Sequence, residues 1–217
     1  MMRSAYRYLI VGLVLTASVL LAASYALKAE MKDPDLDAPW IYDDLAAATA
    51  QAKQTGKPLL VTLRCVPCPA GGKLDALLTH PSPELAAVEQ QFVPVRLVKN
   101  QGLDQRIFQF DHDNSLMVFF LNADGTIYGR YGSRNGNAGN SDNLLSVNAA
   151  RLAMERALAL HRGYPANRAQ LAGKRGPAPQ YAVPEQIPGL TDRDVQPVTR
   201  KQCIHCHMIR EQEITNS

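Results

Sequence analysis

The sequence carries two pairs of cysteines, and each pair has the spacing of a redox or cofactor-binding motif. One pair is Cys203 and Cys206, with His205 between them and His207 directly after the second cysteine. This is the pattern that attaches c-type haem, because the two sulfurs bond the porphyrin and the adjacent histidine binds the iron. The motif predicts a covalent haem on Cys203 and Cys206 with His207 as metal ligand. A metal clip of the same cysteines and histidines, such as a zinc site, is the alternative.

The other pair, Cys65 and Cys68, is also a C-x-x-C, so no cysteine is left outside a motif. It follows an apolar run over residues 58–63 that predicts a buried strand, and a helix is expected to follow it. The positive end of that helix and the charge of Arg64 would lower the pKa of Cys65. We therefore expect Cys65, at a partly exposed helix end, to be the attacking thiolate and Cys68 the resolving thiol. The alternative is a structural disulfide.

The first 30 residues are predicted to export the rest of the chain. Arg3 and Arg7 precede an uncharged run over residues 8–27, and about 20 such residues suffice for a membrane-spanning helix. The same run also fits a cleaved signal peptide. Either way, residues beyond 30 are expected in a compartment where disulfides persist.

Composition narrows the class of protein. The 217 residues carry a net charge of +3, with 46% hydrophobic and 20% charged residues, which fits one globular domain with appendages. Lys and Arg are scattered without a basic run, so we expect no nucleic-acid partner.

Helical and strand patterns alternate between residues 40 and 163. Strand–helix–strand crossovers predict parallel pairs, and a turn at 122–125 adds an antiparallel hairpin, so the expected fold is α/β with a central mixed sheet flanked by helices. The expected helices cover 44–56, 103–110 and 142–163, and the expected strands cover 58–63, 92–98, 116–121 and 126–131. One more helix is expected to carry Leu74, Leu77 and Leu78, and another is expected to start at residues 82–84.

Prolines divide the rest of the chain. Residues 164–200 contain six prolines and little periodicity, which predicts an extended linker or a wrap-around arm. The expected organisation is a membrane or signal segment (1–30), a linker (31–39), a folded domain (40–163), the Pro-rich linker (164–200) and the haem-motif segment (201–217).

Residues 40–131 resemble the thioredoxin-like family. The resemblance is carried by five segments of the sequence: 56–61, 65–68, 92–95, 120–125 and 129–132. It implies a thioredoxin-like fold with Cys65 and Cys68 as the redox pair. The whole layout is similar to bacterial exported proteins in which a thioredoxin-like domain is followed by C-x-x-C-H and then by a PDZ domain, a part that is absent here.

Three positions depart from the family's pattern. Arg64 stands where tryptophan usually precedes the first cysteine, Val66-Pro67 replaces Gly-Pro, and Leu116 occupies the position of the usual cis-proline. The absence of that proline weakens the expectation of a general reductase and leaves room for a restricted partner, a metal, or no turnover.

The sequence therefore predicts an exported, membrane-tethered redox protein of the bacterial cell envelope, on the periplasmic or other extracytoplasmic side. It would couple the Cys65–Cys68 pair to a c-type haem, as a thiol–disulfide oxidoreductase or an electron-transfer protein, with another envelope redox protein as its partner. The alternatives are a non-catalytic binding or sensing scaffold and a copper-handling chaperone, since soft thiolates suit Cu(I).

Overall fold

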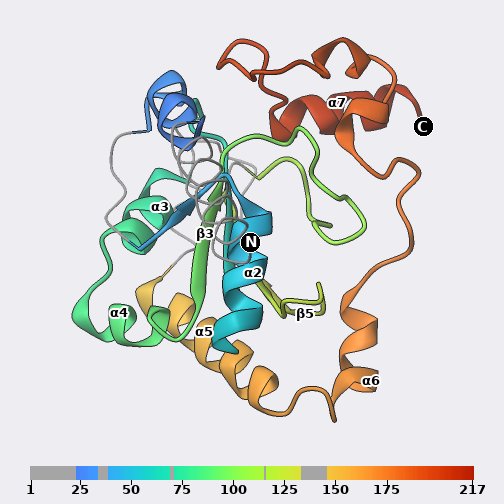
Figure 1. Ribbon diagram of the computed structural model, residues 1–217. Coiled ribbons are helices and arrows are strands. Elements are labelled where there is room, and N and C mark those ends of the chain that lie inside the picture. Colours follow the sequence, from blue (N-terminus) through green and yellow to red (C-terminus); the bar gives the residue numbers. More distant parts are fainter. Residues whose placement is uncertain (1–22, 34–38, 69–70, 115, 133–145) are drawn as a thin grey trace, which may run out of the picture.

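A five-stranded sheet forms the centre of the protein (Figure 1). The computed structural model describes residues 23–33, 39–68, 71–114, 116–132 and 146–217. The strands are β1 (Ile41–Tyr42), β2 (Leu59–Arg64), β3 (Val93–Leu97), β4 (Leu116–Leu121) and β5 (Ile127–Tyr131). They lie in the order β1-β3-β2-β4-β5. β1 and β2 pair parallel to β3, and β4 pairs antiparallel to β2 and to β5. The predicted mixed sheet and its hairpin are confirmed, and β1 is an additional short strand.

Side chains alternate along the strands between two apolar layers. On one face, Val61 and Phe119 pack with Ala48 and Ala52 of α2 (Leu45–Thr55). On the other face, Leu60, Val118 and Phe120 pack under three further helices. Those helices are α3 (Gly72–Thr79), α4 (Pro83–Glu89) and α5 (Val147–Arg162). This arrangement of helices around a mixed sheet is the one expected for a thioredoxin-like fold.

The helix expected over residues 103–110 is wrong, because the structure forms turns there. The Asp104 carboxylate accepts a hydrogen bond from the backbone N–H of Arg106, and the backbone N–H of Phe108 donates to the Asp104 carbonyl. Such local side-chain bonds compete with helix formation. Phe108 is nevertheless buried in the core, which explains the apolar pattern that suggested a helix.

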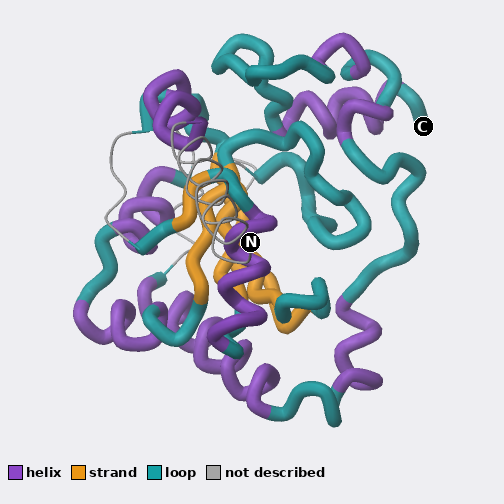
Figure 2. Tube along the Cα trace, in the orientation of Figure 1, coloured by secondary structure: helices purple, strands orange, loops and turns teal. Residues whose placement is uncertain are grey.

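The Pro-rich segment runs along the domain as an arm (Figure 2). It contains α6 (Arg168–Leu171) and three short 3-10 turns, η2 (Ala172–Lys174), η3 (Pro184–Gln186) and η4 (Thr191–Arg193), before α7 (Cys206–Thr215). Gln109 is one of several contacts along it, donating to the Pro177 carbonyl and accepting from the Gly176 N–H, while Arg130 donates to the Lys174 carbonyl. The arm thus delivers the second cysteine motif back to the domain.

Residues 23–31 form a helix at the other end of the chain, followed by a segment that enters the interior. Met31 is fully buried, and Asp33 forms an ion pair with Arg96 of β3. Most of the predicted membrane segment lies outside the described residues. Within the described parts of the chain, no helix combines the length and apolarity needed to span a bilayer.

Glu89, the last residue of α4, provides a test of core electrostatics. Its side chain is buried, and burial raises the pKa of its carboxyl from 4.5 to about 7. Because the folded state then holds a proton that the unfolded state has lost, stability falls as the pH rises from about 4.5 to 7. Glu89→Gln should raise the free energy of unfolding at pH 8, by at most about 3 kcal/mol, and change it little at pH 4.

Urea unfolding at the two pH values measures this effect. Glu84→Gln is the matched control, because Glu84 lies exposed at the start of the same helix and hydrogen bonds there lower its carboxyl pKa. This control should show no gain at pH 8. Equal gains at both pH values in Glu89→Gln would contradict the prediction.

Candidate redox site

The carboxyl ends of the three parallel strands meet at one edge of the sheet. Tyr42 at the end of β1 pairs with Arg96, and Arg96 also pairs with Thr62 of β2. The loops that follow these strands therefore lie together, which is where open α/β sheets usually place their functional groups. One of these loops carries Cys65 and Cys68, and another carries residues 98–101.

Cys65 and Cys68 form a disulfide directly after β2. The backbone N–H of Cys68 donates to the Cys65 carbonyl at 3.0 Å, which closes the loop into a turn. The predicted cysteine pair is therefore close in space and positioned by the central strand. Leu116, the first residue of β4, pairs with Arg64 and lies beside this loop, as the sequence comparison with the cis-proline position implied.

The helix expected after the pair is α3. α3 starts at Gly72, four positions beyond Cys68, and Gly71 precedes it in a left-handed conformation with φ of 83°. A Cβ at position 71 would lie 2.9 Å from the Leu116 Cβ, so this position requires glycine. A left-handed turn at Gly71 therefore lies between the disulfide loop and the start of α3.

Arg64 has a structural role besides the expected one. Its Nη1 donates to the Cys65 carbonyl at 2.8 Å and its Nη2 donates to the Cys68 carbonyl at 2.9 Å. Its Nε donates to Asp75 Oδ2 at 2.9 Å, so an opposite charge pairs with the guanidinium. Arg64 thus holds the backbone of the disulfide loop, and the effect of its charge on the Cys65 sulfur stays a prediction.

Asp75 connects this loop to a second arginine. Arg96 of β3 is 2% exposed and binds Asp75 and Asp33 at the same time. Burial alone would lower the pKa of Arg96, but hydrogen bonds to Asp75 and Asp33 outweigh it and raise that pKa. Two arginines and two aspartates therefore form one balanced buried network.

The second cysteine motif docks against the loop that follows β3. Asn100 Nδ2 donates to the Ile204 carbonyl at 2.8 Å. Gln101 makes two bonds, donating to the Gln202 carbonyl at 2.8 Å and accepting from the Ile204 N–H at 3.2 Å. The two side-chain amides thus bond two carbonyls and one N–H of the segment, as a neighbouring strand would. These bonds hold the segment at the edge of the sheet.

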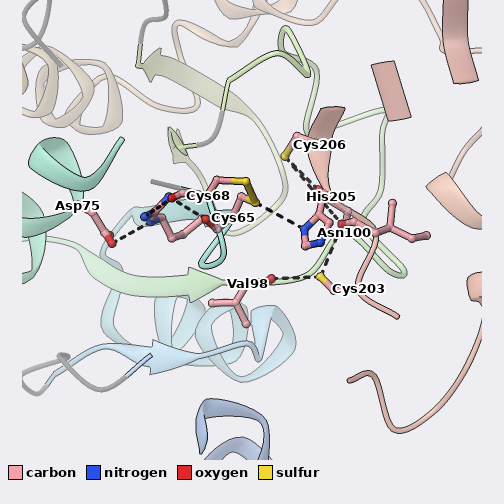
Figure 3. The surroundings of a disulfide bond; sticks show 10 residues. Cys65, Cys68, Asp75, Val98, Asn100, Cys203, His205 and Cys206 are labelled. Atoms are coloured by element: carbon pink, nitrogen blue, oxygen red, sulfur yellow. Dashed lines mark hydrogen bonds and ion pairs between the residues drawn. A yellow bond between two sulfur atoms is a disulfide. The ribbon is translucent and has the colours of Figure 1, made fainter. Parts of the chain in front are cut away.

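Docking places His205 over the disulfide (Figure 3). The Nδ1 atom of His205 lies 3.5 Å from the Cys65 Sγ. Cys65 is 5% exposed, whereas Cys68 is half-buried, so the expectation of a partly exposed Cys65 is wrong. Burial, together with the nearby His207, lowers the pKa of His205, which keeps its ring neutral near pH 7.

The thiols of Cys203 and Cys206 are free and buried, at 1% and 4% exposure. Burial raises the pKa of Cys203 to about 12 and that of Cys206 to about 11. Cys203 packs in an apolar cluster with Met31, Tyr42, Val98 and Val198. His207 is exposed, and its ring stacks on that of His205 with the centroids 5.7 Å apart.

These positions do not fit a covalent haem. A porphyrin bonded to both sulfurs needs open space beside them, and here the domain fills that space. Haem attachment would require residues 201–217 to leave the domain. The zinc and copper sites considered as alternatives have no matching cluster of ligands. The described residues contain no group of three or more His, Cys, Asp or Glu placed to hold a metal ion.

Several site residues had no signal in the sequence. Asn100, Gln101 and Asp75 are ordinary polar residues within a loop or helix, and only the fold brings them to the cysteines. His205 was visible only as part of the second motif, since its contact with Cys65 spans 140 positions.

The role of Arg64 can be tested by separating charge from geometry. Arg64→Lys keeps the charge, but the lysine side chain has one nitrogen where arginine has three, so it cannot make all three hydrogen bonds. If Arg64 acts by holding the two carbonyls, Arg64→Lys and Arg64→Ala should both let dithiothreitol reduce the Cys65–Cys68 disulfide about tenfold faster. Arg106→Lys, at an exposed ion pair with Asp104, is the control and should react like the wild type. A wild-type rate in Arg64→Lys with a changed rate in Arg64→Ala would instead indicate that charge matters.

Comparison with known proteins agrees with this geometry over the part of the chain that forms the sheet. No curated protein matches the chain. Residues 40–123 match the family model described as thioredoxin-like, and this match, with the strand order and the close cysteine pair, supports the thioredoxin-like family for that part of the chain.

Proposed function

We propose that this chain is a thiol–disulfide oxidoreductase in which Cys65 and Cys68 exchange a disulfide with the thiols of a partner protein. The observation that carries the proposal is the disulfide itself, placed directly after β2 at the carboxyl edge of a thioredoxin-like sheet. Two hydrogen bonds from Arg64, which Asp75 holds in place through a third, bind the carbonyls of the loop and leave Cys68 half-buried. A fixed, half-buried sulfur is a suitable target for an incoming thiolate.

The exchange begins at Cys68, because it is the more exposed sulfur of the pair. A thiolate of the partner attacks the Cys68 Sγ, the bond to Cys65 breaks, and Cys65 leaves as a thiolate that takes up a proton. The partner's second thiol, losing its proton, then attacks the mixed disulfide on the partner's own sulfur. Cys68 leaves as a thiolate and takes up that proton, while the partner keeps the new disulfide. Two electrons enter the chain, and the reverse sequence returns them.

The proposed partner is a redox protein of the bacterial cell envelope, on the extracytoplasmic side. A disulfide between Cys65 and Cys68 supports this location, because such bonds persist in exported compartments. Attachment to the membrane through residues 8–27 belongs to the same proposal, and fractionation of the native protein tests it. Electron transfer through a haem is not included, because the docked thiols do not fit that group.

Replacing either cysteine of the disulfide tests the proposal. Cys65→Ser and Cys68→Ser should each abolish catalysed reduction of insulin by dithiothreitol, measured by turbidity, because exchange needs both sulfurs. Gln109→Ala is the control, since the two hydrogen bonds of Gln109 go to residues 176 and 177 of the arm, and it should keep the wild-type rate.

The two variants also form a matched pair for accessibility. The remaining Cys68 in Cys65→Ser should react with oxidised glutathione faster than the remaining Cys65 in Cys68→Ser, because His205 covers Cys65. Wild-type protein that fails to accelerate insulin reduction would show that the disulfide is structural and that the domain is a scaffold.

A further inference from the structure

The two cysteine motifs adjoin each other in the folded chain. His205 of the second motif contacts the Cys65 Sγ, and Val66, inside the first motif, packs on the apolar cluster that contains Cys203. Figure 3 shows the Cys203 and Cys206 sulfurs on either side of Asn100 and His205, with the disulfide facing the His205 ring. An oxidised pair and a reduced pair therefore share one site.

We propose that Cys203 and Cys206 are a second redox-active pair, which reduces the Cys65–Cys68 disulfide within the same chain. This inference rests on the proposed function, because it names the electron donor for that disulfide. Both cysteine pairs, at residues 65 and 68 and at residues 203 and 206, then take part in thiol–disulfide exchange. The chain would pass electrons from its C-terminal dithiol to the thioredoxin-like domain, and from there to a disulfide of the partner by the reverse of the exchange described above.

The transfer needs no external oxidant or reductant. Cys206, as the thiolate, attacks the Cys65 Sγ, and the Cys65–Cys68 bond breaks. Cys68 leaves as a thiolate and takes up the proton that Cys206 released. Cys203 then loses its proton and attacks the Cys206 Sγ, so that Cys65 leaves as a thiolate and takes up that second proton. One disulfide forms, one disulfide breaks, and two electrons move from residues 203 and 206 to residues 65 and 68.

The surroundings of the two thiols identify Cys206 as the attacking group. Asn100 places its Nδ2 donor 3.5 Å and its Oδ1 acceptor 3.9 Å from the Cys206 Sγ, so the nearer atom is a donor, and Cys206 is the first residue of α7. Burial keeps both thiols mostly protonated, but this donor and the helix N-terminus favour the thiolate of Cys206 over that of Cys203. The Cys203 Sγ instead faces two acceptors, the carbonyls of Val98 at 3.6 Å and Ile204 at 3.7 Å, which favour the protonated thiol. The His205 ring now occupies the contact position beside Cys65, so it must turn aside before the sulfurs meet.

This role and a covalent haem exclude each other, because both use the same two sulfurs. Thioether bonds to a porphyrin would leave no thiol for exchange. The expected state of the exported chain is therefore a free dithiol or a disulfide at positions 203 and 206.

Two double variants trap the first step. Cys68→Ser/Cys203→Ser leaves Cys65 and Cys206, whereas the matched control Cys68→Ser/Cys206→Ser leaves Cys65 and Cys203. On oxidation with diamide, the first variant should form an intramolecular disulfide about tenfold faster than the control, at a rate independent of protein concentration. Peptide mapping without reductant identifies the bond. Equal rates, a faster control, or no intramolecular bond would overturn the assignment of Cys206.

The wild-type chain tests the complete transfer. Protein oxidised at 65–68 and reduced at 203 and 206 is incubated without added thiol, then quenched with acid and mapped by differential alkylation. A disulfide between Cys203 and Cys206 should appear at the same rate at all protein concentrations. If that disulfide never forms while insulin reduction persists, the inference is wrong and the proposed function stands. If the wild-type protein does not accelerate insulin reduction, the proposed function itself is wrong. A mass increase of one haem bound through these cysteines would also overturn the inference.

Docking of the segment should control the same thiols. Gln101→Ala removes both hydrogen bonds to residues 202 and 204 and should make Cys203 and Cys206 react with iodoacetamide about tenfold faster. Gln109→Ala is a matched control, because the same side chain there makes two bonds to the arm at residues 176 and 177. This control should alkylate at the wild-type rate. An unchanged alkylation rate in Gln101→Ala, or an equal increase in Gln101→Ala and Gln109→Ala, would contradict the docking of the dithiol through Gln101. It would also contradict the inference that the two cysteine pairs share one site.

Discussion

Arg96 is the residue on which the redox site depends. It lies in β3 with 2% of its surface exposed, and it binds Asp33 before the sheet and Asp75 in α3. Removing one partner from such a buried pair costs about 3–5 kcal/mol, because it leaves an unpaired charge in the interior. Asp75 in turn binds Arg64, which holds the carbonyls on both sides of the disulfide loop. The conformation of that loop is therefore set by a charge network that begins on the neighbouring strand, β3.

The same edge of the sheet receives the second motif for a related reason. The parallel strands β1, β3 and β2 end together, so the loops after them must satisfy their polar groups at a single surface. Asp43, after β1, accepts from the Val98 N–H and pairs with Lys99, which fixes the loop that carries Asn100 and Gln101. The side-chain amides of Asn100 and Gln101 then form hydrogen bonds with the backbone of residues 202 and 204. The docking of a segment so distant in sequence follows from groups that the sheet leaves available at this edge.

Local patterns were enough to predict most of the fold but little of the site. Apolar runs and turn residues predicted β2, β4 and the hairpin, because each depends on neighbours in sequence. The helix expected over residues 103–110 failed because Asp104 forms a local side-chain bond that periodicity does not reveal. Arg64 was assigned to the sulfur for its charge, yet Asp75, eleven positions later, pairs with that charge. The contact of His205 with Cys65 depends on the whole path of the arm, which no local pattern encodes.

Burial gives the second pair two properties that oppose each other. It raises the pKa of Cys203 and Cys206, so both thiols are protonated at neutral pH and react slowly with oxidants in solution. It also excludes a porphyrin, although the motif alone would accept one. Attack on the disulfide of the same site differs, because once the His205 ring turns aside the attacking sulfur needs only a transient thiolate and no diffusion of a reagent. A dithiol protected from the solvent but adjacent to one disulfide is therefore chemically selective, and its selectivity comes from docking rather than from the cysteine spacing.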